Sequence, residues 1–330
     1  MWSFYGITVA FGLYAHPFSA LVSLGHGLYV ILVEKWQGRK QIFAGFLSTL
    51  MGIVLFLPWL NIVLANFSDF VENTISTSTP RPQLYLLWGL NISRIFFDVN
   101  QGTSPLNPTL YLFIGLVGYS IYVLCRQAPP RIWVFLITLM GVTGLALMVP
   151  DVVAGGRRSS ILRYAVPCVL GIQLTVSYML ASKLTAATNR EFRRWKRIAI
   201  ALIFGGILSC LVSAHVPVWW HKSPAKSRFN PAIADIINVS DRPLVISDEI
   251  QGRVLAFLHL LRQDVVVQLV VPPQLPQIPQ GFNPIFLYRL SDPAKAALAQ
   301  ATNARLEEAY DRGWLWQLVP NNTSSPEENS

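Results

Sequence analysis

The feature that most constrains this chain is a series of long, almost uncharged apolar runs. They lie at about residues 2–14, 17–33, 41–65, 109–125, 132–150, 164–182 and 198–216. A helix needs about 20 apolar residues to cross roughly 30 Å of hydrocarbon, and its backbone groups are then bonded internally. Only 13% of the residues are charged, whereas soluble domains carry about 25%. We therefore expect an α-helical polytopic membrane protein with about six to seven transmembrane helices.

The first two runs are short, and "YAHPF" (14–18) separates them. Pro17 favours a break here, because the residue before a proline avoids helical geometry. The two runs are therefore either one kinked span or a re-entrant pair.

Basic residues predict the orientation of the spans. Eleven Lys or Arg lie in the segments 34–40, 126–131 and 183–197, which share one side if the spans alternate. Short basic loops are typical of the cytoplasmic side. The other side then holds residues 66–108, residues 151–163 and the chain after about 217. Orientation accounts for much of the net charge of +9, and we expect no nucleic-acid partner.

The chain changes character after the last run. Residues 242–247, 265–271 and 284–290 read as short strands, whereas 248–263 and 292–310 read as helices. This alternation predicts a small α/β domain. We expect a helical membrane domain over 1–216, an extracytoplasmic α/β domain over 217–320 and a disordered tail over 321–330.

The stretch "GRRSSILRYAVP" (156–167) places Arg157, Arg158 and Arg163 on the side that the positive-inside rule depletes of basic residues. A guanidinium matches phosphate oxygens in pairs, so these residues favour the phosphate or pyrophosphate of a lipid. The alternative is that they reach lipid head groups from a helix end. His16 is expected on the same side. Three roles stay open for it: binding a phosphate oxygen, transferring a proton, or a structural role.

Other reactive residues form no recognisable pattern. The three cysteines lie inside apolar runs, and no histidine has metal-ligand spacing. We therefore predict no metal site and no cofactor, but the binding of a divalent metal ion stays open. The outer segments carry Asp69, Glu72, Asp98 and Asp151. A general base would be a carboxylate near the reacting hydroxyl, but spacing does not distinguish any of these four.

Two segments resemble the GT-C superfamily of membrane glycosyltransferases. They are "FGLYAHPFSALVSLGHGLYV" and "SSILRYAVPCVLGIQLTVSYMLA", and they are most similar to protein mannosyltransferases and bacterial lipid A aminoarabinose transferases. Gly12 to His16 match a "GLYTH" type segment, with Ala15 in place of threonine. Arg163, Tyr164 and Pro167 match an "RY..P" segment that opens a later helix.

This resemblance implies transfer of a sugar from a polyprenyl-phosphate donor to an acceptor of unknown identity. Transfer would take place on the outer face of a bacterial inner membrane, with inversion at the anomeric carbon and no cofactor. The residues expected to bind the lipid phosphate are His16, Arg157, Arg158, Arg163 and Tyr164. Such enzymes carry their catalytic aspartate in the first outer loop, so we expect the base upstream and regard 1–216 as the C-terminal portion of the membrane domain.

Two other functions stay open at this stage. One is a non-catalytic membrane scaffold or partner subunit whose outer α/β domain binds another protein. The other is a transporter of lipid or solute. Transporters usually place polar or broken helices at the midplane, and the spans here lack midplane charges, so transport is the weaker of the two.

Overall fold

A computed structural model describes residues 2–34, 39–67, 80–102, 104–186, 188–221, 227–271, 274–310 and 313–321. The protein is mostly helical, with a small C-terminal sheet. Five helical segments among these residues are long and apolar enough to cross a membrane: Arg39–Ala65, Pro108–Gln127, Pro130–Gly155, Val166–Thr185 and Asn189–His215. The contacts divide the chain into two compact units, Met1–Val212 and Ser213–Ser330. The predicted tail lies almost entirely outside the described residues.

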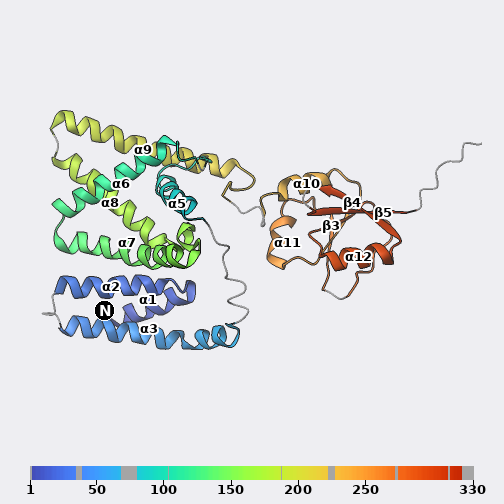
Figure 1. Cartoon of the computed structure of the whole chain (residues 1–330), viewed down its shortest axis with the longest axis horizontal. Coiled ribbons are helices and arrows are strands. Elements are labelled where there is room, and N and C mark those ends of the chain that lie inside the picture. The colour runs from blue at the N-terminus through green and yellow to red at the C-terminus, as the bar shows by residue number, and fades with distance from the viewer. Residues whose placement is uncertain are drawn as a thin grey trace, which may run out of the picture. The chain divides into compact units, whose positions relative to one another are not determined.

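The two short apolar runs form a helical hairpin. Helix α1 (Trp2–Ala15) and helix α2 (Ser19–Glu34) are about 21 Å and 24 Å long at 1.5 Å per residue. They lie side by side, because the Tyr5 hydroxyl is 3.2 Å from Nδ1 of His26 across the pair. The chain therefore turns back at 16–18, which excludes a single kinked span. Figure 1 shows this pair beside α3 (Arg39–Ala65).

Two glycines bring α1 and α3 into close contact. A Cβ on Gly52 would lie 2.7 Å from Cγ1 of Val9 and 2.8 Å from the carbonyl oxygen of Gly6. A Cβ on Gly6 would in turn lie 2.7 Å from the carbonyl oxygen of Ser48. Small residues that let helix backbones approach are a common basis of packing inside membranes.

We expect Gly52→Ala to destabilise the α1–α3 contact, because the added methyl meets backbone that cannot rotate away. Overpacking of this kind typically costs about 1–3 kcal/mol. The matched control is Gly118→Ala on α6 (Pro108–Gln127), where a Cβ meets nothing within 4 Å. Thermal unfolding in detergent should show a lower Tm for Gly52→Ala only, and equal Tm values would contradict this packing.

The remaining helices of the first unit pack around α7 (Pro130–Pro150) and α8 (Val166–Ala186). Helix α2 contacts α7, α6 contacts α8, and α5 (Arg81–Arg94) contacts α6. Helix α6 begins at Pro108, where the Asn107 side chain accepts the Thr109 N–H at 3.1 Å. Helix α9 (Asn189–His215) differs from the others because none of its described residues is buried.

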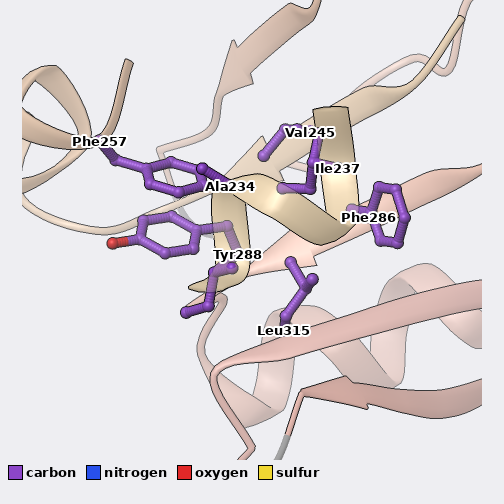
Figure 2. Close-up of a cluster of buried hydrophobic side chains, with 8 residues drawn as sticks. Ala234, Ile237, Val245, Phe257, Phe286, Tyr288 and Leu315 are labelled. Atoms are coloured by element: carbon purple, nitrogen blue, oxygen red, sulfur yellow. The ribbon is translucent and has the colours of Figure 1, made fainter. Parts of the chain in front are cut away.

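The C-terminal unit contains a five-stranded sheet in the order β2-β1-β3-β5-β4. Strand β1 (Leu244–Ser247) pairs in parallel with β2 (Val266–Leu269) and β3 (Ile285–Tyr288), whereas β5 (Leu315–Pro320) and β4 (Ala304–Tyr310) are antiparallel. Its helices are α10 (Asn230–Asn238), α11 (Gln251–Leu258) and α12 (Asp292–Ala301). In the core, Phe257 of α11 stacks on Tyr288 of β3 with 4.1 Å between ring centroids (Figure 2).

The helix predicted over 292–310 is wrong in its second half. Helix α12 ends at Ala301, Asn303 takes the left-handed conformation at φ 49°, and β4 begins at Ala304. The alanines and glutamates of 304–310 favour a helix locally. Pairing with β5 overrides that preference. Strand β5 was not predicted from the sequence, so the partner that makes β4 a strand was missed.

An ion cluster follows β1 and β3. Glu249 Oε2 lies 2.7 Å from Nε of Arg289 and 2.9 Å from Nη1 of Arg253. Burial raises the pKa of the Glu249 carboxyl, but the Ile250 N–H and the two arginines outweigh it, so the net pKa is lowered. A depressed carboxyl pKa contributes stability above the unfolded value of about 4.3, and this stability is lost as pH falls through the folded pKa.

We therefore expect Glu249→Gln to loosen the C-terminal unit at pH 7 but to have little effect once the pH is below the lowered pKa of the folded carboxyl, where the wild-type side chain is itself protonated. Hydrogen exchange of peptides covering 244–258, compared between variant and wild type at the same pH, measures this. Faster exchange in the variant at pH 7 and convergence at low pH are expected. A difference that is the same at both pH values would contradict it.

Candidate functional site

The turn between α1 and α2 fixes the ring of His16. Its Nδ1 accepts the Phe18 N–H at 3.2 Å, and the His16 N–H itself donates to the Gly12 carbonyl at 2.8 Å. When Nδ1 is an acceptor, the proton of the neutral ring is on Nε2. His16 therefore presents a donor N–H at a half-buried position at the end of α1.

The arginine segment joins α7 to α8 through short turns. A π-helical turn spans Asp151–Gly155, and two 3-10 turns span Arg158–Ser160 and Leu162–Tyr164. The side chains of Arg157, Arg158 and Arg163 are exposed. Within the described residues, the Arg157 and Arg158 side chains form no hydrogen bond or ion pair.

Tyr164 joins the arginine segment to the turn of His16. Its ring centroid lies 5.5 Å from that of His16 and 5.2 Å from that of Phe18. An Nη2–H of Arg163 donates to the Tyr164 hydroxyl at 2.8 Å, and the guanidinium carbon lies 4.8 Å from the ring centroid. The structure thus brings together three of the five predicted residues, His16, Arg163 and Tyr164, which we call the outer cluster after the side on which the sequence predicts them.

Asp151 holds the arginine segment in place. The residue is 5% exposed, and its Oδ2 accepts hydrogen bonds from both the N–H and the hydroxyl of Ser159 at 2.6 Å. Gly156 passes so close to Oδ1 that a Cβ there would collide with it. Asp151 was among the acids considered as a general base, but its carboxylate is engaged by backbone and hydroxyl of the same segment.

Helix α5 binds the other side of this segment. Trp88 Nε1 donates to the Ser159 hydroxyl and Asn91 Nδ2 donates to the Ser160 carbonyl, both at 2.8 Å. Arg94 Nη1 in turn donates to Asn91 Oδ1 at 3.2 Å. These residues could not be identified from the sequence, because only the fold brings them to the arginine segment.

Arg94 adds a positive charge on α5, beside the Asn91 side chain that binds the arginine segment. Burial lowers the pKa of its guanidinium, and the nearby Asp98 carboxylate acts in the opposite direction. The backbone N–H of Asp98 donates to the Ser209 hydroxyl of α9 at 2.9 Å. Asp69 and Glu72, the other acids considered as a base, lie outside the described residues. Across the described ranges, no three His, Cys, Asp or Glu side chains gather where they could hold a metal ion.

A cavity of about 660 Å³ lies among α1, α2, α3 and α7. Apolar and aromatic side chains form nearly all of its lining, including Trp2, Phe46 and Phe135. Leu13 and Ala20 also line it, and these residues are close in sequence to His16 on either side of the turn. Its apolar lining suits a hydrocarbon chain. Because Leu13 and Ala20 flank the turn of His16, the cavity also extends toward the outer cluster.

Comparison with protein-family models, with curated proteins and with solved structures finds no match. The likeness to the GT-C superfamily therefore rests on the two short segments given above. The five candidate spans indicate an integral membrane protein.

Proposed function

We propose that this chain binds the phosphate of a polyprenyl-phosphate sugar on the outer face of a bacterial inner membrane, as part of a GT-C type glycosyltransferase. The observation that carries the proposal is the outer cluster, in which His16, Arg163 and Tyr164 come from two distant segments and meet at one end of the bundle. These are the positions at which the family resemblance is found. Arg157 and Arg158 are assigned to the same phosphate through their charge.

The donor groups of this cluster suit a phosphate ester. Arg163 supplies guanidinium N–H groups, His16 supplies Nε2–H, and the Tyr164 hydroxyl, which accepts from Arg163, still has its own hydrogen to donate. The arginine segment contributes positive charge that no carboxylate of the described residues pairs with. A polyprenyl chain would occupy the apolar cavity beside the turn.

In the proposed reaction, an acceptor hydroxyl oxygen forms a bond to the anomeric carbon as the bond from that carbon to the phosphate oxygen breaks. The bonding electrons go to the phosphate, and a base takes the hydroxyl proton. Arg163 and His16 would stabilise the negative charge that develops on the leaving phosphate. We assign no residue of this chain as the base.

A second candidate is a non-catalytic subunit that binds the same lipid phosphate. One observation favours it. The Asp151 carboxylate accepts two hydrogen bonds from Ser159, so it is already occupied and is a poor candidate for a general base. The C-terminal domain would then bind another protein. The transporter alternative gains no support from the described residues.

The test measures sugar transfer in proteoliposomes. They contain polyprenyl phosphates that carry a hexose or an aminopentose as donors, and an envelope lipid extract as the source of acceptors. Mass spectrometry follows the release of free polyprenyl phosphate. Release by the wild type, reduced at least tenfold in His16→Ala and Arg163→Ala, is expected of the enzyme. Binding of the donor without release would favour the second candidate, and absence of both would overturn the proposal.

A further inference from the structure

The first nine residues of α9, Asn189–Arg197, form a strongly basic surface away from the outer cluster. They contain five cations: Arg190, Arg193, Arg194, Lys196 and Arg197. All five side chains are exposed. The apolar part of α9 follows directly, so these charges lie where the helix leaves the hydrocarbon.

An aromatic contact fixes which side of α9 faces the bundle. The Trp195 ring stacks on Tyr119 of α6 with 5.9 Å between centroids and an interplanar angle of 6°. Lys183 of α8 lies 5.7 Å from the centroid of the same Tyr119 ring. The last turn of α8 and the start of α9 therefore meet α6 at Tyr119, and Trp195 marks the side of α9 that faces the bundle.

The cations of α9 point away from that contact. With 3.6 residues per turn, Arg190, Arg193 and Arg197 fall on one stripe on the face opposite Trp195. The side chains of these three arginines are exposed, and no described residue of α9 is buried. The stripe therefore faces whatever surrounds the protein at the membrane surface.

The protein itself does little to neutralise these charges. Glu191 is the one carboxylate in the sequence of α9, and its Oε2 lies 3.5 Å from the Thr188 hydroxyl. Within the described part of the chain, none of the five cations forms an ion pair. Clusters of four to eight Lys or Arg next to a membrane span attract anionic lipid head groups, at about 1 kcal/mol per residue.

We propose that the stripe of Arg190, Arg193 and Arg197 binds the phosphate groups of anionic phospholipids in the leaflet at this end of the bundle. This site is independent of the proposed function, because it lies at the start of α9 and not at the turn of His16. Lipid binding holds the start of α9 at the head-group level. It thereby supports a helix of which no described residue is buried, and α9 is the helix to which the C-terminal unit is attached.

The test measures the affinity of dioleoylphosphatidylglycerol for the full chain in detergent by native mass spectrometry, with dioleoylphosphatidylcholine as the neutral lipid. The wild type is expected to prefer the anionic lipid. The triple variant Arg190→Gln, Arg193→Gln and Arg197→Gln should lose about a hundredfold in that affinity, because each charge is worth about fivefold. Its affinity for the neutral lipid should be unchanged.

Three controls make the result decisive. Replacing the same three arginines by lysine should preserve the preference, which separates loss of charge from loss of folding. Replacing three exposed arginines of the C-terminal unit, Arg228, Arg242 and Arg305, by glutamine removes equal charge and should have no effect. Glycerol phosphate, the soluble head group, should not compete. Equal affinity of wild type and the α9 glutamine variant, or an equal loss in the control variant, would overturn the proposal.

Discussion

Replacement of Asp151 by alanine is expected to lower the Tm of the detergent-solubilised protein by about 10 °C. Hydrogen bonds to a charged group contribute about 1.5–3 kcal/mol each, and Oδ2 accepts two of them, from the N–H and the hydroxyl of Ser159. Removing the carboxylate leaves the buried N–H without its acceptor. An effect of about 3–5 kcal/mol corresponds to this change in Tm for a chain of this size.

Two variants show whether the effect belongs to this contact. Ser159→Ala keeps the N–H but removes the hydroxyl, which donates to Asp151 and accepts from Trp88, so it should also lower the Tm, though by no more than Asp151→Ala. Asp264→Ala, at a side chain that is 63% exposed and paired with Arg262, should leave the Tm unchanged within about 1 °C. If Asp151→Ala were as stable as the wild type, Asp151 would not be the anchor of the arginine segment.

Arg163→Ala is expected to weaken the binding of polyprenyl phosphate by about 10- to 100-fold. A guanidinium paired with phosphate contributes about 1.5–3 kcal/mol, and 1.4 kcal/mol is a factor of ten in affinity. The side chain is exposed, and among the described residues its hydrogen bond and its cation–π contact are both with Tyr164, so its removal should not disturb folding. Lipid titration followed by native mass spectrometry measures the change.

Three further variants are controls for Arg163→Ala. They test the geometry of the donors, the hydrogen bond to Tyr164 and the position of the charge. Arg163→Lys keeps the charge but loses the paired donors, so it should recover only part of the affinity. Tyr164→Phe removes the hydroxyl that accepts from Arg163 and should cost a few-fold. Arg126→Ala removes a cation at the other end of the bundle, where it lies 5.9 Å from the Tyr122 ring, and should have no effect. Equal losses in Arg126→Ala and Arg163→Ala would show that only overall charge matters.

The membrane helices were predictable because their signal is local. Length and apolarity define α3, α6, α7 and α8 within a few residues, since a span in lipid must bond its own backbone. Helix α9 begins at Asn189, well before the run predicted from residue 198, because its first turns are basic and not apolar. The two short runs were ambiguous because a proline break is compatible with either a kink or a hairpin. Only the contact between Tyr5 and His26 decides between them.

The candidate site was predictable only in part. The charge of Arg157, Arg158 and Arg163 stood out against the expected orientation, and the short family segments pointed to His16 and Tyr164. The support of the site could not be found in this way. Asp151 is eight residues from Ser159, and Trp88 is separated from Ser159 by 71 residues, so their roles depend on the fold.

The C-terminal sheet shows the same limit. Strands β1 and β3 were visible as compact apolar runs, and both are fully or largely buried. Strand β4 has an alternating, half-exposed sequence that is also rich in helix-forming residues. Its structure is decided by its partner β5, which carries no strong signal of its own.

The most direct test of the account compares the affinity of the wild-type protein for decaprenyl phosphate with its affinity for decaprenol, which has the same hydrocarbon chain without the phosphate. Because we assign the phosphate to His16, Arg163 and Tyr164, we expect at least tenfold tighter binding of decaprenyl phosphate. We also expect this preference to fall sharply in the double variant His16→Ala and Arg163→Ala. Equal affinity for the two lipids, or a preference that survives in the double variant, would contradict it.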